Sequence, residues 1–165
     1  MHHLCRINML FIKQVQDLFS QNYSLIRLFN SIHIILFRVT NGMLLGSLAG
    51  LPSLLLTTKG RRTGKLRTSA LIYLEWEKKY LIVASFGGNP KPPAWLLNIK
   101  EDEKVTVHIP GMILNATATV ADRKIRDEVW PKLLNFYPSF GKYEELSGRT
   151  IPVVILEPLN QKPRI

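Results

Sequence analysis

Two strand-like segments joined by a short basic turn, between Leu54 and Leu74, constrain the fold more than any other feature of this sequence. The first segment opens with three consecutive leucines, and the second alternates its residues between two faces. A period of two is the signature of a β-strand. The turn contains Gly60 and Gly64, and glycine tolerates the positive φ angles that tight reversals require. The stretch therefore predicts a β-hairpin.

The tip of the predicted hairpin carries five cations and no anion. These cations are Lys59, Arg61, Arg62, Lys65 and Arg67. Neighbouring cations repel each other unless an anion lies among them, and no Asp or Glu occurs from Leu18 to Leu74. Phosphate suits such a site, because Arg offers a planar fork of donors and Lys a point charge. A solvated basic turn is the alternative, but the lack of nearby acidic residues favours an anionic ligand.

The composition is that of an ordinary globular chain with an unusual charge. A length of 165 residues fits one domain with a substantial core. The net charge of +10 favours an anionic partner, that is, a phosphorylated small molecule, a nucleic acid or an anionic membrane surface. The single cysteine, Cys5, cannot form an internal disulfide, which fits a cytoplasmic location. The four histidines share no metal-ligand spacing, so the sequence predicts no metal site.

Residues 24–40 form the strongest helical pattern, because their apolar side chains recur at helical spacing. Ser24 is a predicted N-cap and Gly42 a predicted C-cap. The helix is apolar on more than one face, so we expect either burial in the core or a peripheral contact with a membrane, on the inner face of the cell membrane. His33 is expected on the helix surface. No apolar run reaches the roughly 18 residues of a membrane span.

The rest of the chain predicts further strands and helices. Strands are expected at residues 80–85, 104–109, 112–121 and 151–156, and helices at residues 94–99, 123–137 and 139–146. Asp122 and Ser139 are predicted caps, and Pro131 is expected to kink or restart its helix. About six mostly antiparallel strands with flanking helices give an α+β fold, which closes most easily as a small barrel. The expected parts are a helical arm over residues 1–41, a barrel domain over residues 42–158 and a tail over residues 159–165.

Four blocks of the sequence carry a family resemblance. The blocks are Thr57–Thr68 (TTKGRRTGKLRT), Val83–Gly88 (VASFGG), Pro93–Asn98 (PAWLLN) and Arg149–Val153 (RTIPV). In their order and spacing they resemble the deazaflavin-dependent nitroreductase family, and the resemblance covers roughly residues 42–158. It implies a split β-barrel fold, related to the flavin mononucleotide-binding (FMN-binding) oxidases. It also implies binding of coenzyme F-420, a deazaflavin that carries a phosphate and a polyglutamate tail.

The resemblance assigns the basic hairpin to the charged part of this cofactor. Arg62 and Arg67 are expected to hold the phosphate or the tail, with help from Lys59, Arg61 and Lys65. Charge reasoning and family resemblance therefore agree on an acidic ligand.

The deazaflavin ring is expected to lie against the turn of Ser85, Phe86, Gly87 and Gly88. A flat ring can approach a backbone closely only where side chains are missing, which explains the glycines. Phe86 stands where the family usually has Lys or another polar residue. Trp95 matches a family tryptophan near the cofactor, although a core aromatic that anchors a short helix is the alternative.

The resemblance places the acceptor pocket after the long helix. Tyr137, Tyr143 and Ser85 are the expected catalytic residues, which orient the acceptor or donate a proton. Phe140 lacks the hydroxyl found in the characterised nitroreductase, and the loss of one polar contact can change selectivity. The implied function is hydride transfer from reduced F-420 to an electron-poor acceptor, that is, a quinone, a nitro compound or an activated alkene.

Other functions remain open at this point. The basic hairpin suits any phosphorylated flavin, so an FMN-dependent oxidoreductase and a non-catalytic flavin- or deazaflavin-binding protein are alternatives. A nucleic-acid-binding barrel would also suit the net charge of +10. The predicted exposed strand positions are Thr, Ser and Asn rather than a row of stacking aromatics, so we expect no nucleic-acid partner.

Overall fold

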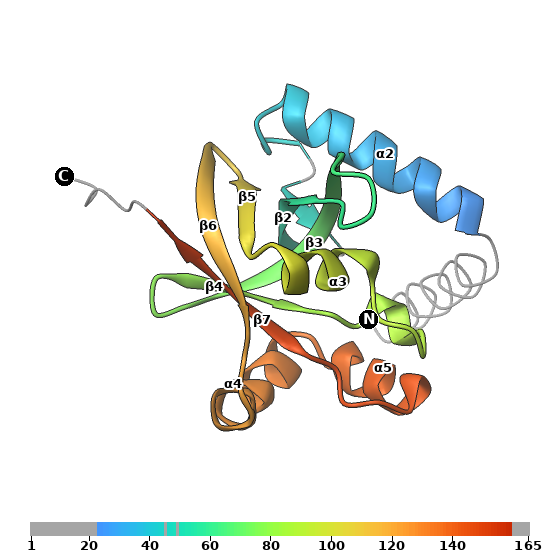
Figure 1. The fold of residues 1–165 in the computed structure, drawn as a ribbon, viewed down its shortest axis with the longest axis vertical. Coiled ribbons are helices and arrows are strands. Elements are labelled where there is room, and N and C mark those ends of the chain that lie inside the picture. The colour runs from blue at the N-terminus through green and yellow to red at the C-terminus, as the bar shows by residue number, and fades with distance from the viewer. Residues whose placement is uncertain (1–22, 45, 49, 160–165) are drawn as a thin grey trace, which may run out of the picture.

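The computed structural model describes residues 23–44, 46–48 and 50–159 (Figure 1). The other residues of the predicted arm and tail lie outside this part of the chain. The helices are α2 (Tyr23–Val39), the 3-10 helix η1 (Phe86–Gly88), α3 (Ala94–Glu101), α4 (Arg123–Phe136) and α5 (Ser139–Ser147). The strands are β1 (Ser47–Leu48), β2 (Leu51–Lys59), β3 (Leu66–Trp76), β4 (Lys79–Val83), β5 (Lys104–Ile109), β6 (Met112–Val120) and β7 (Val153–Pro158).

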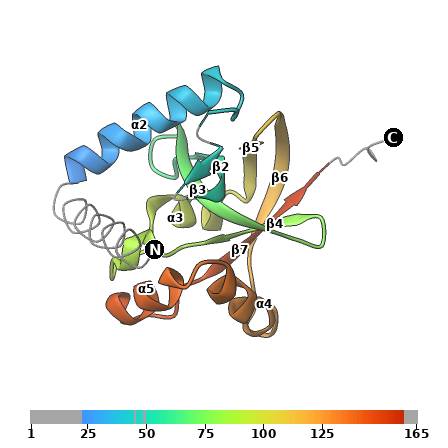
Figure 2. The ribbon, with the colours of Figure 1, turned by 180° about the vertical axis from the view of Figure 1, so that it is seen from behind.

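Six antiparallel strands close into a barrel. The hydrogen-bonded order is β2, β3, β4, β7, β6 and β5, and β5 pairs again with β2. The short β1 extends this sheet by pairing with β2. Figures 1 and 2 show α2 on one side of the barrel and α4 with α5 on the opposite side. The prediction of an α+β barrel with about six antiparallel strands is therefore confirmed.

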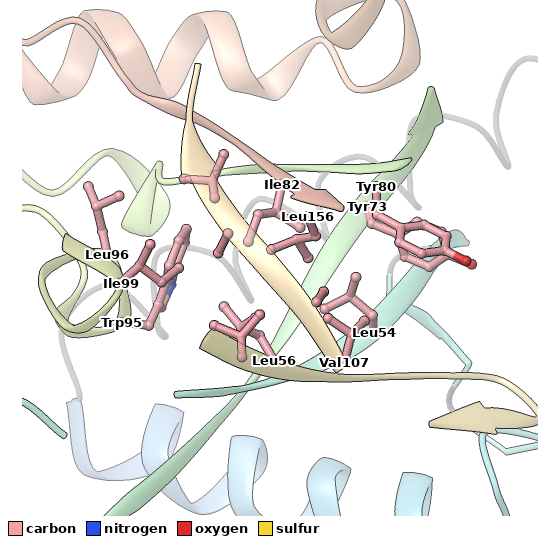
Figure 3. Packing of buried hydrophobic residues seen from close by; sticks show 14 of the residues in the cluster. Leu54, Leu56, Tyr73, Tyr80, Ile82, Trp95, Leu96, Ile99, Val107 and Leu156 are labelled. Atoms are coloured by element: carbon pink, nitrogen blue, oxygen red, sulfur yellow. The ribbon is translucent and has the colours of Figure 1, made fainter. Parts of the chain in front are cut away.

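The inside of the barrel holds the main hydrophobic core (Figure 3). The predicted alternation is confirmed, because Val105, Val107 and Ile109 of β5 are all buried. Figure 3 shows Trp95 of α3 at one end of this cluster, and the Tyr73 and Tyr80 rings lie at the other end. The helix α3 therefore covers one end of the barrel, which fixes its position relative to the hairpin of β2 and β3.

A second hydrophobic cluster lies between the barrel wall and the two C-terminal helices. Val129 and Leu133 of α4 pack with Phe140 of α5 and with Leu81 and Val153 of the wall. All five side chains are buried. This cluster holds α5 against the strands that carry the η1 loop.

Helix α2 packs on the barrel through few residues. Phe37 is fully buried, and its ring meets the His108 ring edge-on at 5.0 Å. Arg38 Nη2 donates to Thr68 Oγ1 of β3 at 2.8 Å. His33 is buried too, so the expectation of a surface histidine is wrong. Periodicity indicates which residues share a helix face, but not which face packs against the barrel.

The end of α2 differs from the prediction in its capping residue. Asn41 adopts a positive φ of 50°, and the Gly42 N–H donates to the Phe37 carbonyl at 2.7 Å. This is a Schellman motif with Asn41 at the first position after the helix cap, and Gly42, which follows it, also has a positive φ of 78°. Asn41 Oδ1 also lies 2.9 Å from His108 Nε2, which ties the helix end to β5.

Three further capping predictions have different outcomes. Asp122 is confirmed as the N-cap of α4, because its Oδ1 accepts a hydrogen bond from Ile125 N at 2.8 Å. Ser139 is wrong as a cap, since it is the first residue of α5 and Pro138 precedes it without a side-chain cap. Ser24 lies inside α2 rather than before it. Helix α4 continues through Pro131, so the predicted restart does not occur.

Candidate functional site

The turn between β2 and β3 is closed by its own backbone. Gly60 N donates to the Lys65 carbonyl at 2.9 Å, and Gly64 N donates to the Gly60 carbonyl at 2.7 Å. A Cβ on Gly60 would lie 3.0 Å from that same Lys65 carbonyl oxygen, and Gly64 adopts a positive φ of 65°. Both glycines are therefore required by the turn, and the predicted hairpin is confirmed.

The cations of this turn are exposed to solvent. They are Lys59, Arg61, Arg62, Lys65 and Arg67. None of them takes part in an ion pair within the described part of the chain. Their charges are therefore free to attract an anion.

An open hollow of about 260 Å³ lies between the turn and helix α3. Its lining includes the three arginines of the turn, together with Trp95 and Asn98 of α3, and it contains no acidic residue. A neighbouring hollow of about 330 Å³ is lined by Lys59 and Arg61 but also by Glu101 and Asp102. The first hollow is the better anion site, because no carboxylate opposes its arginines.

Asn98 is a residue of this site that sequence reasoning did not assign. It is 4% exposed, and its Nδ2 donates to Thr58 Oγ1 of β2 at 3.0 Å. Its Oδ1 accepts from the Arg61 backbone N–H at 3.2 Å and from Arg61 Nη1 at 3.4 Å. A buried amide on a short helix that otherwise carries apolar residues is the signal that could have found it.

Trp95 lies in the core and also faces the candidate site. Its side chain is buried in the barrel core, as expected for an anchor of α3. It also lines the hollow between α3 and the basic turn. The structure therefore brings Trp95 together with Arg61, Arg62 and Arg67, as the cofactor prediction requires.

The η1 loop has an unusual backbone. Phe86, Gly87 and Gly88 all adopt positive φ, at 50°, 63° and 83°. Phe86 is 47% exposed. A Cβ on Gly88 would lie 3.0 Å from Leu146 Cβ, so only glycine allows α5 to approach the loop this closely.

Arg149 is a second residue that sequence reasoning left without a role, although it lies in one of the resembling blocks. Its Nη2 donates to the Ala84 carbonyl at 3.0 Å and to the Ser85 carbonyl at 3.4 Å. Its Nε donates to the Asn89 carbonyl at 3.3 Å. One guanidinium thus binds the backbone on both sides of η1, and it fixes the loop that includes Ser85.

The predicted acceptor residues come together where α4 meets α5. The Tyr137 and Tyr143 hydroxyl oxygens lie 3.4 Å apart, and the Phe140 ring packs edge-on against the Tyr137 ring. Burial, followed by the hydrogen bond to Tyr137, raises the pKa of Tyr143, so its hydroxyl is neutral at physiological pH. A Cβ on Gly88 would lie 3.4 Å from Tyr143 Cα, which places this corner beside η1.

Helix α5 is also fixed by a charged group. Glu144 Oε1 accepts from Arg126 Nη2 at 2.6 Å and from the Ile151 backbone N–H at 2.8 Å. Arg126 Nε in turn donates to the Ile151 carbonyl at 3.1 Å. These bonds join α4, α5 and the chain before β7, so the position of Tyr143 is set by the barrel.

The candidate site therefore consists of two groups joined by the segment 89–93. One group is the basic turn with Trp95 and Asn98, and the other is the η1 loop with Tyr137 and Tyr143. Arginines without an opposing carboxylate suit the phosphate of a ligand, and a backbone turn without Cβ atoms at Gly87 and Gly88 suits its flat ring. No cluster of three metal-binding side chains occurs among the residues that the structure describes.

Solved structures support the fold and the cofactor class. An F420-H2 dependent reductase, FDR-A, is 36% identical, with a TM-score of 0.59 over 64% of this chain and 94% of that chain. A second solved protein, described as a domain-swapped dimer, is 32% identical, with a TM-score of 0.61 over 76% of this chain and 96% of that chain. The split β-barrel expected from the sequence is thereby confirmed.

The sequence comparisons agree. An F420H(2)-dependent quinone reductase of Mycobacterium tuberculosis is 34% identical over 129 residues, which cover 76% of this chain and 87% of that protein. Residues 30–158 match the family model described as F420H(2)-dependent quinone reductase. Coenzyme F-420 is therefore the cofactor, and the FMN alternative gains no support. The chain belongs to the F420H(2)-dependent quinone reductase family, whose members are oxidoreductases that transfer a hydride from reduced F-420 to a quinone.

Proposed function

We propose that the basic turn and α3 bind the charged part of F-420, while the η1 loop and the α4–α5 corner bind the ring and the quinone. Arg62 and Arg67 bind the phosphate or the tail, because both are exposed at the hollow without an acidic partner. Lys59, Arg61 and Lys65 add positive potential around them. The observation that carries this proposal is the hollow lined by arginines beside Trp95.

On the ring side, the chain offers backbone rather than side chains. Gly87 and Gly88 leave room for a flat ring, and the exposed Phe86 ring adds an apolar rim. Reduced F-420 supplies the hydride when it is bound. The protein fixes the loop through Arg149 and excludes water with the apolar rim.

The tyrosine pair orients the quinone. Within the described residues, Tyr137 and Tyr143 hydrogen-bond to each other, and no carboxylate or imidazole hydrogen-bonds either hydroxyl. A neutral hydroxyl can donate to a quinone oxygen, but without a base beside it, it is a poor general acid–base group at neutral pH. Ser85 stands at the start of η1 and completes this side of the site.

A binding titration tests the cofactor part of the proposal. The purified protein is titrated separately with oxidised F-420 and with FMN, and fluorescence is followed. We expect micromolar or tighter binding of F-420 and much weaker binding of FMN. Equal affinity for both would contradict the assignment of the arginines to the F-420 tail.

We infer that α2 also contacts a membrane surface. The apolar side chains exposed on and after this helix are Ile32, Ile35, Leu36, Val39, Met43 and Leu44. No helix in the described ranges is long and apolar enough to cross a membrane. A net charge of +10 and an apolar acceptor class both favour a peripheral contact with anionic lipid. In this division, the exposed face of α2 contacts the membrane and the barrel domain over residues 42–158 binds the cofactor.

Flotation with liposomes tests this contact. Ile35→Glu with Val39→Glu leaves the core intact, since these side chains are 60% and 79% exposed, whereas deleting the helix would remove the buried Phe37. We expect the wild type to float with anionic liposomes and the double variant to remain in the bottom fraction of the gradient. If the variant instead only lost self-association, the helix face would bind a second copy of the chain.

A further inference from the structure

We propose that Asn98 is the positioning residue that sets the basic turn against α3, so that Arg61 serves the structure while Arg62 and Arg67 meet the ligand. This inference rests on the proposed function, because it names how the F-420 site is held in its binding geometry. Asn98 itself is a buried neutral amide on α3.

The first observation is that the turn depends on Asn98 for its attachment. Residues 60–65 form hydrogen bonds among themselves. Their bonds to another element, within the described part of the chain, are the two from Arg61 to Asn98 Oδ1. Among the described residues, the hydrogen bonds that join the turn to α3 therefore converge on one amide oxygen.

The second observation is that Asn98 is itself fixed. Its Nδ2 donates to Thr58 Oγ1, and both side chains are buried. This bond orients the amide so that its oxygen points to Arg61. Hydrogen bonds from Thr58 to Asn98 and from Asn98 to Arg61 thus connect β2, α3 and the turn.

The third observation separates the three arginines. Arg61 Nη1 is bound to Asn98, and the Arg61 backbone is bound as well. Arg62 and Arg67 line the same hollow with guanidinium groups that form no ion pair among the described residues. The amide therefore orients the turn through Arg61 and leaves the other two arginines available to an anion.

The test uses Asn98→Ala with two measurements. Hydrogen–deuterium exchange of the free protein should become faster at residues 60–65 and stay unchanged in the barrel strands. The affinity for oxidised F-420 should fall about tenfold, as expected when a buried hydrogen-bonded anchor is removed. The dependence of affinity on salt should keep its slope, since no cation is lost.

A second variant, Thr58→Val, covers the case in which Asn98→Ala fails to fold. It removes the bond that orients the amide but leaves Asn98 in place, so it should move both measurements in the same direction by a smaller amount. Asn135→Ala, on the exposed side of α4, is the matched control and should change neither.

Each outcome decides between explanations. Weaker F-420 binding with unchanged exchange at the turn would mean that Asn98 contacts the ligand directly, which overturns the proposal. No change in either measurement would overturn it as well. Failure of the wild type to bind F-420 would instead refute the proposed function, while the exchange experiment would still report on the anchor.

Discussion

The basic turn and the η1 loop both use positive-φ glycines, but they are held in opposite ways. In the turn, Arg62 and Lys65 are exposed without an ion pair among the described residues, and Arg61 joins the turn to Asn98 of α3. On both sides of η1, Arg149 binds three backbone carbonyls, and α5 packs behind the loop. The difference teaches that a site for charge needs available side chains, whereas a site for a flat ring needs a fixed, bare backbone.

The largest expected effect comes from filling the space behind η1. Gly88→Ala should destabilise the protein by about 1–2 kcal/mol through its positive φ alone, and more because its Cβ would lie 3.0 Å from Leu146 Cβ. Gly64→Ala in the basic turn is the matched control, since its φ is also positive but nothing lies within 4 Å of a Cβ there. Urea denaturation measures both, and equal losses would mean that α5 does not press on η1.

The next effect comes from removing the guanidinium behind the loop. Arg149→Met removes the guanidinium bonds to the Ala84, Ser85 and Asn89 carbonyls, which should cost about 1–3 kcal/mol and lower turnover. Arg123→Met, whose side chain is 95% exposed, is the control and should lie near zero. Thermal unfolding measures the loss of stability, and a quinone reduction assay measures turnover. If a destabilised Arg149→Met variant kept its turnover, the position of the η1 loop would not matter for catalysis.

A smaller effect on folding, but a clear one on binding, is expected at the turn. Arg62→Ala and Arg67→Ala should each weaken F-420 binding about tenfold and reduce its dependence on salt. Thermal stability should stay unchanged, because both side chains are exposed without ion pairs in the described chain. Lys142→Ala on α5 is the control cation. If Arg62→Ala or Arg67→Ala changed turnover but not the salt dependence of F-420 binding, the basic turn would not be a separate site for charge.

The smallest effect concerns the tyrosines beside η1. Burial raises the pKa of Tyr143 above its usual value, so the folded state keeps this proton longer than the unfolded state does. The resulting stabilisation is complete below the unfolded pKa of about 10 and is lost as pH rises through the folded pKa. In Tyr143→Phe, the free energy of unfolding should therefore decline less steeply above pH 10. If the free energy of unfolding of the variant declined as steeply as that of the wild type, the proton lost on unfolding above pH 10 would belong to another group.

The sequence was sufficient for the six barrel strands and for the charges, but not for the short β1. The apolar run before the glycine turn and the alternation after it indicate the hairpin, and the cations at its tip are exposed because burying an unpaired charge is costly. Alternation likewise gave the inward face of β5, as Val105 and Val107 show. These features are local, so the order of residues determines them.

The two polar anchors could not be assigned in the same way. Asn98 and Arg149 both lie in the resembling blocks, yet their partners are Arg61 and the Ala84 carbonyl, which are distant in sequence. Only the closed barrel brings these groups together. His33 illustrates the same limit, because the helical pattern could not indicate which face of α2 the barrel would cover.

The closure of the barrel has a consequence for how the protein folds. The β2–β3 hairpin joins neighbouring segments, but β2 must also pair with β5, and two strands and two helices lie between them. Long-range pairings pay their loop entropy before they gain contacts, so closure should follow the local hairpin. Until β5 arrives, β2 has an unpaired edge that is rich in leucine, of the kind that promotes aggregation. The nascent chain would therefore be most vulnerable to aggregation after the basic turn has formed and before residues 104–109 leave the ribosome.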